Sequence, residues 1–216
     1  MLTYEQASDK VIIALDCSRE RAFELAELLA GKATWVKAGM PLFYAEGPAI
    51  VDAMRERGLC VFLDLKVHDI PFQVQGAVRA ASLTGADILS IHGLGSSAMI
   101  AAARKGAEEA ADERGGDRTR LVAISVLTSM DQAALSEIGV ESPVAEEVAR
   151  LASLAYGSGA GGRRDARTSR PGRPHRHARR SSRGRRGGGP EAHRHAGRRD
   201  RGRRVQARHR PPDHGC

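Results

Sequence analysis

The sequence has few aromatic residues, few cysteines and no long hydrophobic run. Aromatic residues make up 4% of its 216 residues and hydrophobic residues 41%, enough for a core but a thin one for this length. No apolar run approaches the roughly 20 residues of a membrane-spanning helix. The polar N-terminus lacks the basic and apolar segments of a signal peptide. The three cysteines, Cys17, Cys60 and Cys216, have no metal-ligand spacing. We therefore expect a reduced, cytoplasmic protein with no membrane partner.

The C-terminal quarter lacks lysine and almost every large apolar residue. Residues 161–216 contain no Ile, Leu, Met, Phe, Trp or Tyr, but 19 Arg and 4 acidic residues, a charge of 19 − 4 = +15. Residues 1–160 have 15 basic and 22 acidic residues, a charge of −7. The C-terminal segment cannot bury enough apolar area to offset its chain entropy. We therefore predict a folded domain over residues 1–160 and a disordered Arg/Gly/Pro/His-rich tail over residues 161–216.

Residues 1–160 alternate between short β-branched runs and amphipathic stretches with helical spacing. The expected strands are Val11–Asp16, Thr34–Met40, Cys60–Val67, Ala86–Gly93 and Leu121–Thr128. The expected helices are Glu20–Leu29, Pro48–Arg57, Pro71–Thr84, Ala98–Arg114 and Pro143–Tyr156. Apolar strands that alternate with helices predict α/β units around a parallel sheet. Five such units make up five-eighths of a (β/α)₈ TIM barrel, which typically needs about 250 residues.

Charged residues lie at the ends of three of these strands. In the string FLDLKVHDIP, Asp64 and Lys66 are two residues apart, so they share one face of a strand. Asp69 follows at the carboxyl end, where barrel active sites are built. Lys37 lies in the preceding apolar strand, and Asp16 ends the first. Charges on apolar strands are costly unless they are paired or used, which predicts one catalytic cluster.

Each of these residues also has a structural interpretation. Asp16 alone is typical of a turn former or a helix cap. Lys37 alone is equally consistent with a functional residue and with a side chain that extends to solvent. We interpret His68 as a residue that orients its loop. The Asp-x-Lys-x-x-Asp pattern within a strand is harder to explain as structure, although more than one activity shares it.

The strings IALD, WVKAGM, FLDLKVHDIP, SIHGLG and ISVLTSM occur in this order between residues 8 and 160. In order and spacing they resemble orotidine 5′-phosphate decarboxylase of the shorter bacterial type. The resemblance implies a (β/α)₈ barrel that works as a homodimer, with sites near the subunit interface. It also implies a lyase of de novo pyrimidine synthesis that converts orotidine 5′-monophosphate to uridine 5′-monophosphate and CO₂. That family uses no metal and no organic cofactor.

By the same resemblance, Lys66 is the general acid that protonates C6, and Asp64 lies beside the substrate carboxylate. Lys37 and Asp69 complete a catalytic Lys-Asp-Lys-Asp array, in which Asp69 reaches the site of the partner subunit. A fixed ammonium stabilises the carbanion without solvent reorganisation. The substrate-binding residues implied are Asp16 at a ribose hydroxyl, Lys37, Asp64, Lys66, Asp69, Ile70, Gln73 and Thr128. Phe72-Gln73 stand where many relatives have Asn-Thr, which alters the side-chain contact at position 73.

The resemblance ends near residue 160. Two late phosphate-binding motifs of the family, Gly-Asp-Gln-Lys-Arg and Gly-Arg-Pro-Ile-Thr, are missing from this reading frame. The possible codons for residues 188–193, read after the first base is dropped, are compatible with the sequence G-D-Q-K-R-I. The same shift permits T-P-G-V-R-P at residues 177–182 and V-I-G-R-P-I-T at 208–214. We therefore hypothesise a one-base frameshift near residues 160–162, and we expect little or no decarboxylase activity from the chain as written.

Two other functions remain open at this point. A 3-hexulose-6-phosphate synthase-like barrel enzyme shares the Asp-x-Lys-x-x-Asp pattern but needs a metal, and the IALD and HDIP contexts favour the decarboxylase. Alternatively, the Arg-rich tail binds nucleic acid non-specifically through phosphate contacts. The tail has no aromatic residue for base stacking, so the frameshift explains its composition better.

Overall fold

The computed structural model of the chain describes residue 3 and residues 7–161. These residues belong to one compact unit, Met1–His175. The predicted disorder of the tail and the motifs of the second reading frame lie outside the described residues, apart from Gly161. None of the helices that the structure describes is long and apolar enough to cross a membrane.

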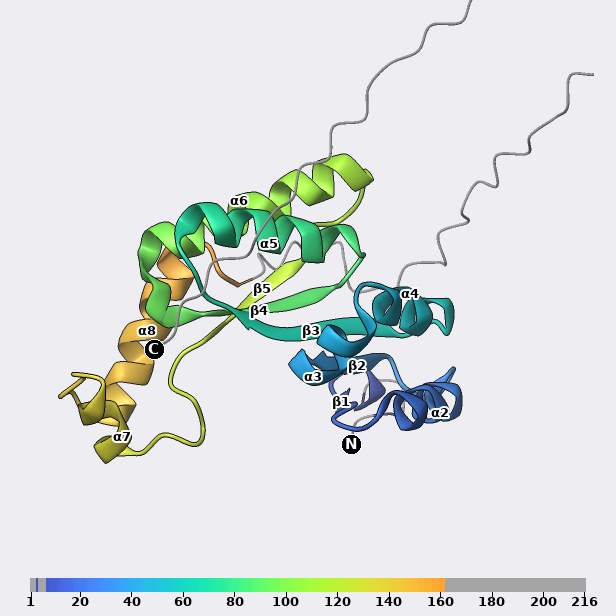
Figure 1. Cartoon of the computed structure of the whole chain (residues 1–216), viewed down its shortest axis with the longest axis horizontal. Coiled ribbons are helices and arrows are strands. Elements are labelled where there is room, and N and C mark those ends of the chain that lie inside the picture. The colour runs from blue at the N-terminus through green and yellow to red at the C-terminus, as the bar shows by residue number, and fades with distance from the viewer. Residues whose placement is uncertain (1–2, 4–6, 162–216) are drawn as a thin grey trace, which may run out of the picture. The chain divides into compact units, whose positions relative to one another are not determined.

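Five parallel strands form one sheet in the order of the chain. They are β1 (Ile12–Ala14), β2 (Trp35–Gly39), β3 (Cys60–Val67), β4 (Ile88–His92) and β5 (Arg120–Ile124). Each strand pairs in parallel with the next, and the connecting segments between them carry helices, as parallel pairing requires (Figure 1). The prediction of five βα units around a parallel sheet is confirmed.

The five predicted helices are present with small shifts at their ends. They are α2 (Arg19–Leu29), α4 (Ala49–Glu56), α5 (Pro71–Leu83), α6 (Ser96–Arg114) and α8 (Val144–Gly157). Figure 1 shows α5 and α6 side by side over the strands β3 to β5. Gly31, Gly58, Gly85 and Gly115, which follow helix ends, all have positive φ, as a left-handed helix cap requires.

Three short elements were not predicted: α3 (Met40–Glu46), the 3₁₀ turn η1 (Gly93–Gly95) and α7 (Gln132–Glu137). Each has at most seven residues, fewer than the roughly 11 to 18 residues over which a helical apolar period can be recognised. Capping residues are the signals that remain: Pro41 occupies the first turn of α3, and the Asp131 carboxylate accepts a hydrogen bond from the Ala134 N–H at 2.9 Å. Pro in a first turn and Asp at an N-cap are typical of helix starts.

The fifth strand is shorter than predicted and ends at Ile124 instead of Thr128. Its pairing with β4 stops at His92, because β4 turns away into η1 directly after that residue. Thr128 therefore lies in a turn after the strand.

One face of the sheet packs against the helices. Alternate strand residues are buried in a single core with residues of the helices, among them Val36, Leu63, Leu89 and Leu121. The other face has the charged residues, together with Trp35 of β2 and Arg120 of β5. The Arg120 guanidinium lies 4.9 Å from the centre of the Trp35 ring, although two strands separate β2 from β5. This face is therefore concave, as in a barrel interior.

The last described residue, Gly161, is hydrogen-bonded to the edge strand β5. The N–H of Gly161 donates to the carbonyl of Leu121 in β5 at 2.9 Å. A similar backbone bond precedes β4, where the Asp87 N–H donates to Val61 of β3 at 2.9 Å. Ala160 is buried in the core. Gly161 thus bonds to β5 in the way that Asp87, directly before β4, bonds to β3.

Candidate active site

Four of the predicted site residues come together at the carboxyl ends of three adjacent strands. Asp16 follows β1, Lys37 lies in β2, and Asp64 and Lys66 lie in β3. Gly39 pairs with Asp64 in the register of β2 and β3. Parallel strands bring their carboxyl ends to one edge of a sheet, so these side chains meet there.

The four side chains form a chain of alternating charge. Lys37 Nζ lies 2.9 Å from Asp16 Oδ1 and 3.7 Å from Asp64 Oδ2, and Lys66 Nζ lies 2.9 Å from the same Asp64 oxygen. The side chain of Asp64 is 15% exposed and that of Asp16 is 64% exposed. Asp64 is therefore the shielded centre of the array, between two ammonium groups.

The environment of Asp64 favours its ionised form. Burial acts against the carboxylate, but hydrogen bonds from Lys66 and Ser90 and the charges of Lys66 and Lys37 outweigh it, so the Asp64 pKa is lowered. A carboxylate that accepts hydrogen bonds beside cations behaves in this way. Asp64 is thus a fixed negative charge at neutral pH.

The backbone of β3 is irregular at this point. From Leu63 to Val67, β3 advances four residues, while its partner β4 advances two, from Leu89 to Ile91. Within this bulge Lys66 has a φ of 49°, a left-handed conformation that is uncommon for a non-glycine residue. Bulges bend a strand and change the direction of its side chains.

Ser90 of β4 lies opposite the bulge and was missed by the sequence reasoning. Its hydroxyl donates to Asp64 Oδ1 at 2.8 Å and accepts from the Lys66 N–H at 2.8 Å. The residue is fully buried. The available signal was one polar residue within the apolar run of residues 88–91.

The loop after β3 places its predicted residues at the surface. Asp69 is exposed, and its Oδ1 accepts a hydrogen bond from the Ile70 N–H at 2.6 Å. Among the residues that the structure describes, Asp69 makes no ion pair with a lysine. Ile70, Phe72 and Gln73 are exposed beside it, at the start of α5. Asp69 is therefore not part of the array within one chain.

Thr128 also lies apart from the array. It is exposed in the turn after β5, and within residues 7–161 no hydrogen bond joins it to the four charged residues.

Two histidines stack at the ends of β3 and β4. The ring centroids of His68 and His92 are 5.0 Å apart with an angle of 18° between the planes. His92 Nδ1 accepts from the Leu94 N–H at 3.4 Å. Burial lowers the His92 pKa, and the charges of His68 and Lys66 lower it further. This contact ties the loop that contains Asp69 to β4.

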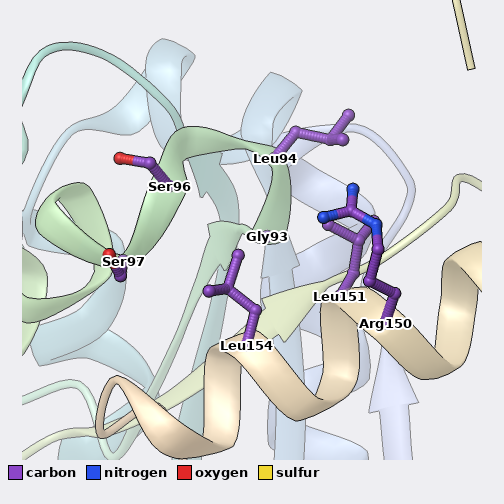
Figure 2. A pocket seen from close by; sticks show the side chains of 7 residues that line it. All are labelled: Gly93, Leu94, Ser96, Ser97, Arg150, Leu151 and Leu154. Carbon is purple, nitrogen blue, oxygen red and sulfur yellow. The ribbon is translucent and has the colours of Figure 1, made fainter.

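A separate hollow of about 340 Å³ lies beside the end of β4. Figure 2 shows that its walls come from two segments: η1 with the first turn of α6, and α8. The lining residues are Gly93, Leu94, Ser96, Ser97, Arg150, Leu151 and Leu154. None of the charged array lines this hollow. Within the part of the chain that the structure describes, no three His, Cys, Asp or Glu side chains are arranged to hold a metal ion.

Comparisons with known proteins match most of the chain to one family. The profile of the "Orotidine 5'-phosphate decarboxylase / HUMPS family" matches residues 9–174. The orotidine 5'-phosphate decarboxylase of Alkalilimnicola ehrlichii is 48% identical over 154 residues, which are 71% of this chain and 63% of that protein. The enzyme of the same name from Anaeromyxobacter sp. strain K is 44% identical over 156 residues, 72% of this chain and 65% of the relative. The chain thus spans just under two thirds of the length of these relatives.

Solved structures agree as well. The crystal structure of orotidine 5'-phosphate decarboxylase from Lactobacillus acidophilus matches with a TM-score of 0.64 and 36% identity, over 69% of this chain and 68% of that one. An uncharacterized conserved protein from Geobacillus kaustophilus matches with a TM-score of 0.66 and 41% identity, over 69% and 70%. The chain belongs to the orotidine 5'-phosphate decarboxylase / HUMPS family and has the TIM-barrel-type fold of that family.

Proposed function

We propose that the Asp16–Lys37–Asp64–Lys66 array is the decarboxylation site for orotidine 5′-monophosphate, with uridine 5′-monophosphate and CO₂ as products. The observation that carries this proposal is the position of Asp64 Oδ2, 2.9 Å from Lys66 Nζ and 3.7 Å from Lys37 Nζ. Decarboxylation breaks the bond between C6 and the carboxylate and leaves its electron pair on C6. An ammonium held in place beforehand stabilises that charge without reorganisation.

Lys66 is the proton donor in this mechanism. As CO₂ leaves, the C6 carbanion takes a proton from Lys66 Nζ, which becomes a neutral amine. Asp64 holds the ammonium at hydrogen-bond distance and lies beside the substrate carboxylate. Asp16, the most exposed of the four, contacts a ribose hydroxyl, and Ile70, Gln73 and Thr128 complete the substrate contacts.

A second copy of the chain completes the site. Asp69 is exposed and makes no ion pair with a lysine among the described residues, and exposed apolar side chains flank it, Ile70 at 62% and Phe72 at 80%. We infer a homodimer in which Asp69 enters the partner's array. Sedimentation equilibrium should give twice the chain mass, and Phe72→Asp should shift it toward the monomer.

The array favours this activity over a metal-dependent one. A 3-hexulose-6-phosphate synthase-like reaction needs carboxylates free to bind a divalent cation, but lysine ammonium groups lie against both Asp16 and Asp64. Decarboxylation should therefore be indifferent to EDTA. Activity that EDTA abolishes and a divalent metal restores would favour the alternative.

The hydrogen bond of Gly161 to β5 supports the frameshift hypothesis. The Gly161 N–H already bonds to β5, and the Arg-rich sequence starts directly after it. The change in composition thus falls where the chain returns to the edge of the sheet, a point at which a barrel would continue with an apolar run. We propose that a one-base shift near residues 160–162 replaced the last three βα units and the phosphate-binding motifs.

One experiment tests the function and the hypothesis together. The gene is resequenced across codons 155–170 and expressed both as written and with the frame restored. We expect the restored protein to turn over orotidine 5′-monophosphate, measured by the loss of its ultraviolet absorbance, and its Lys66→Ala variant to be inactive. The chain as written should show little or no turnover. Equal activity of the two chains would contradict the impairment, and an active Lys66→Ala variant would contradict the mechanism.

A further inference from the structure

One serine on β4 faces three residues of β3. Because β3 advances from Leu63 to Val67 while β4 advances from Leu89 to Ile91, the three residues 64–66 lie opposite Ser90 alone. We propose that Ser90 is a positioning residue, whose hydroxyl holds both the Lys66 backbone and the Asp64 carboxylate in place. The effect of this positioning on catalysis rests on the proposed function, whereas the positioning itself does not.

The hydroxyl fills the gap that the bulge leaves in the hydrogen-bond ladder. The Lys66 N–H donates to Ser90 Oγ at 2.8 Å in place of a strand carbonyl. Without that acceptor, this part-buried N–H loses its partner, which is unfavourable. The φ of 49° at Lys66 is sparsely populated for residues with a Cβ, so it persists only where the surroundings impose it.

The same hydroxyl also fixes the carboxylate. Ser90 Oγ donates its single proton to Asp64 Oδ1 at 2.8 Å, while the other oxygen, Oδ2, faces Lys66 Nζ at 2.9 Å and Lys37 Nζ at 3.7 Å. A hydroxyl has one proton to donate, and the acceptor role toward Lys66 leaves that proton for Asp64. Ser90 thereby connects the backbone of the proton donor to the carboxylate that holds its ammonium.

A second buried serine provides a matched control. Ser82 of α5 is as fully buried as Ser90, but its Oγ has no hydrogen-bond partner among the described residues. Ser82→Ala therefore removes a buried hydroxyl of equal size with no link to the array. Ser90→Thr keeps the hydroxyl and serves as the conservative variant.

The test uses NMR on the full chain to measure the Asp64 pKa and the exchange rate of the Lys66 amide. Asp is labelled at its carboxyl carbon, and the Asp64 signal is assigned by its loss in Asp64→Asn. In Ser90→Ala we expect the Asp64 pKa to rise above that of the unchanged chain and the Lys66 amide to exchange at least tenfold faster. We expect Ser90→Thr to restore both values, and Ser82→Ala to change neither. An unchanged Asp64 titration in a folded Ser90→Ala chain overturns the proposal.

The unchanged chain gives a second readout that needs no variant. If Ser90 accepts from the Lys66 N–H, that amide is protected to the same degree as the ladder amides of β3. Exchange at the rate of an exposed loop amide overturns the proposal, even where Ser90→Ala fails to fold. Neither readout uses decarboxylation, so loss of the proposed activity and loss of the positioning role are distinguished.

Discussion

Asp64 Oδ2 and Lys66 Nζ lie 2.9 Å apart, on residues that are two apart in one strand. In a regular strand such neighbours share a face. Here the strand is bulged and Lys66 has a left-handed backbone, yet the two side chains still meet. The contact therefore depends on the partner strand β4 as well as on the spacing within β3.

The Asp64 carboxylate should make stability depend on acid pH. The fold lowers its pKa below the value of about 3.9 in an unfolded chain, so the unfolded chain binds more protons in acid. The stabilisation is complete above about pH 4 and is lost as pH falls through the folded pKa. Urea midpoints between pH 5 and 2.5 should fall less steeply in Asp64→Asn than in the unchanged chain.

The absolute stability of Asp64→Asn is not the relevant comparison, because Lys37 and Lys66 lose their shared partner in that variant. The relevant comparison is the slope of the urea midpoint against pH. Identical slopes in the two proteins would show that the carboxylate is not held in its ionised form by the fold.

His92 of the stacked pair should titrate below the value of a free histidine. Burial, His68 and Lys66 lower the His92 pKa, so the folded chain resists protonation there. The contribution of His92 to stability is complete above the unfolded value of about 6.5 and declines as pH falls below it. NMR of the ring protons should give His92 a pKa below 6.5, and His68→Phe should raise it, because a charged neighbour is removed. A His92 pKa at or above 6.5 in the unchanged chain would contradict the burial of the His92 ring beside His68 and Lys66.

The order of the elements and the meeting of the charged residues at the strand ends were predictable from the sequence, whereas the backbone of Lys66 and the contacts of Ser90 were not. Runs such as Cys60–Val67 are long and apolar enough to predict a buried strand, and its observed bounds are the same. The conformation of Lys66 and the bonds of Ser90 depend on the register between β3 and β4, which no local pattern encodes. For the same reason, the spacing that predicted a shared face for Asp64 and Lys66 could not reveal that Asp69 lies outside the array within one chain.

The glycine at the end of β2 should be required for the array. A Cβ on Gly39 would lie 3.3 Å from Asp16 Oδ1 and 3.7 Å from Lys37 Nζ, so Gly39→Ala must displace the Asp16 carboxylate. A misplacement of about 1 Å can cost about 100-fold in rate, and the shift needed here is only a few tenths of an ångström. In the frame-restored protein we expect kcat/KM to fall by less than about 10-fold, with the circular dichroism spectrum unchanged. Unaltered kinetics would show that Asp16 tolerates the shift.

Two helical glycines should respond oppositely to the same substitution. A Cβ on Gly106 of α6 would overlap the carbonyl oxygen of Gln75 in α5, and backbone atoms can move only if the helices separate. Overpacking of this kind costs about 1–3 kcal/mol. Gly76 of α5 has nothing within 4 Å of the added Cβ, so alanine there gains helix propensity of about 1 kcal/mol.

Thermal unfolding of the two variants measures this difference directly. Gly106→Ala should lower Tm and Gly76→Ala should raise it, because both positions are helical and only the first has a neighbouring backbone in the way. Gln75 also donates from Nε2 to Glu109 of α6 at 2.8 Å, and a separation of the helices in Gly106→Ala would break that bond as well. Equal shifts in the two variants would mean that α5 and α6 do not cross as closely as the structure has them.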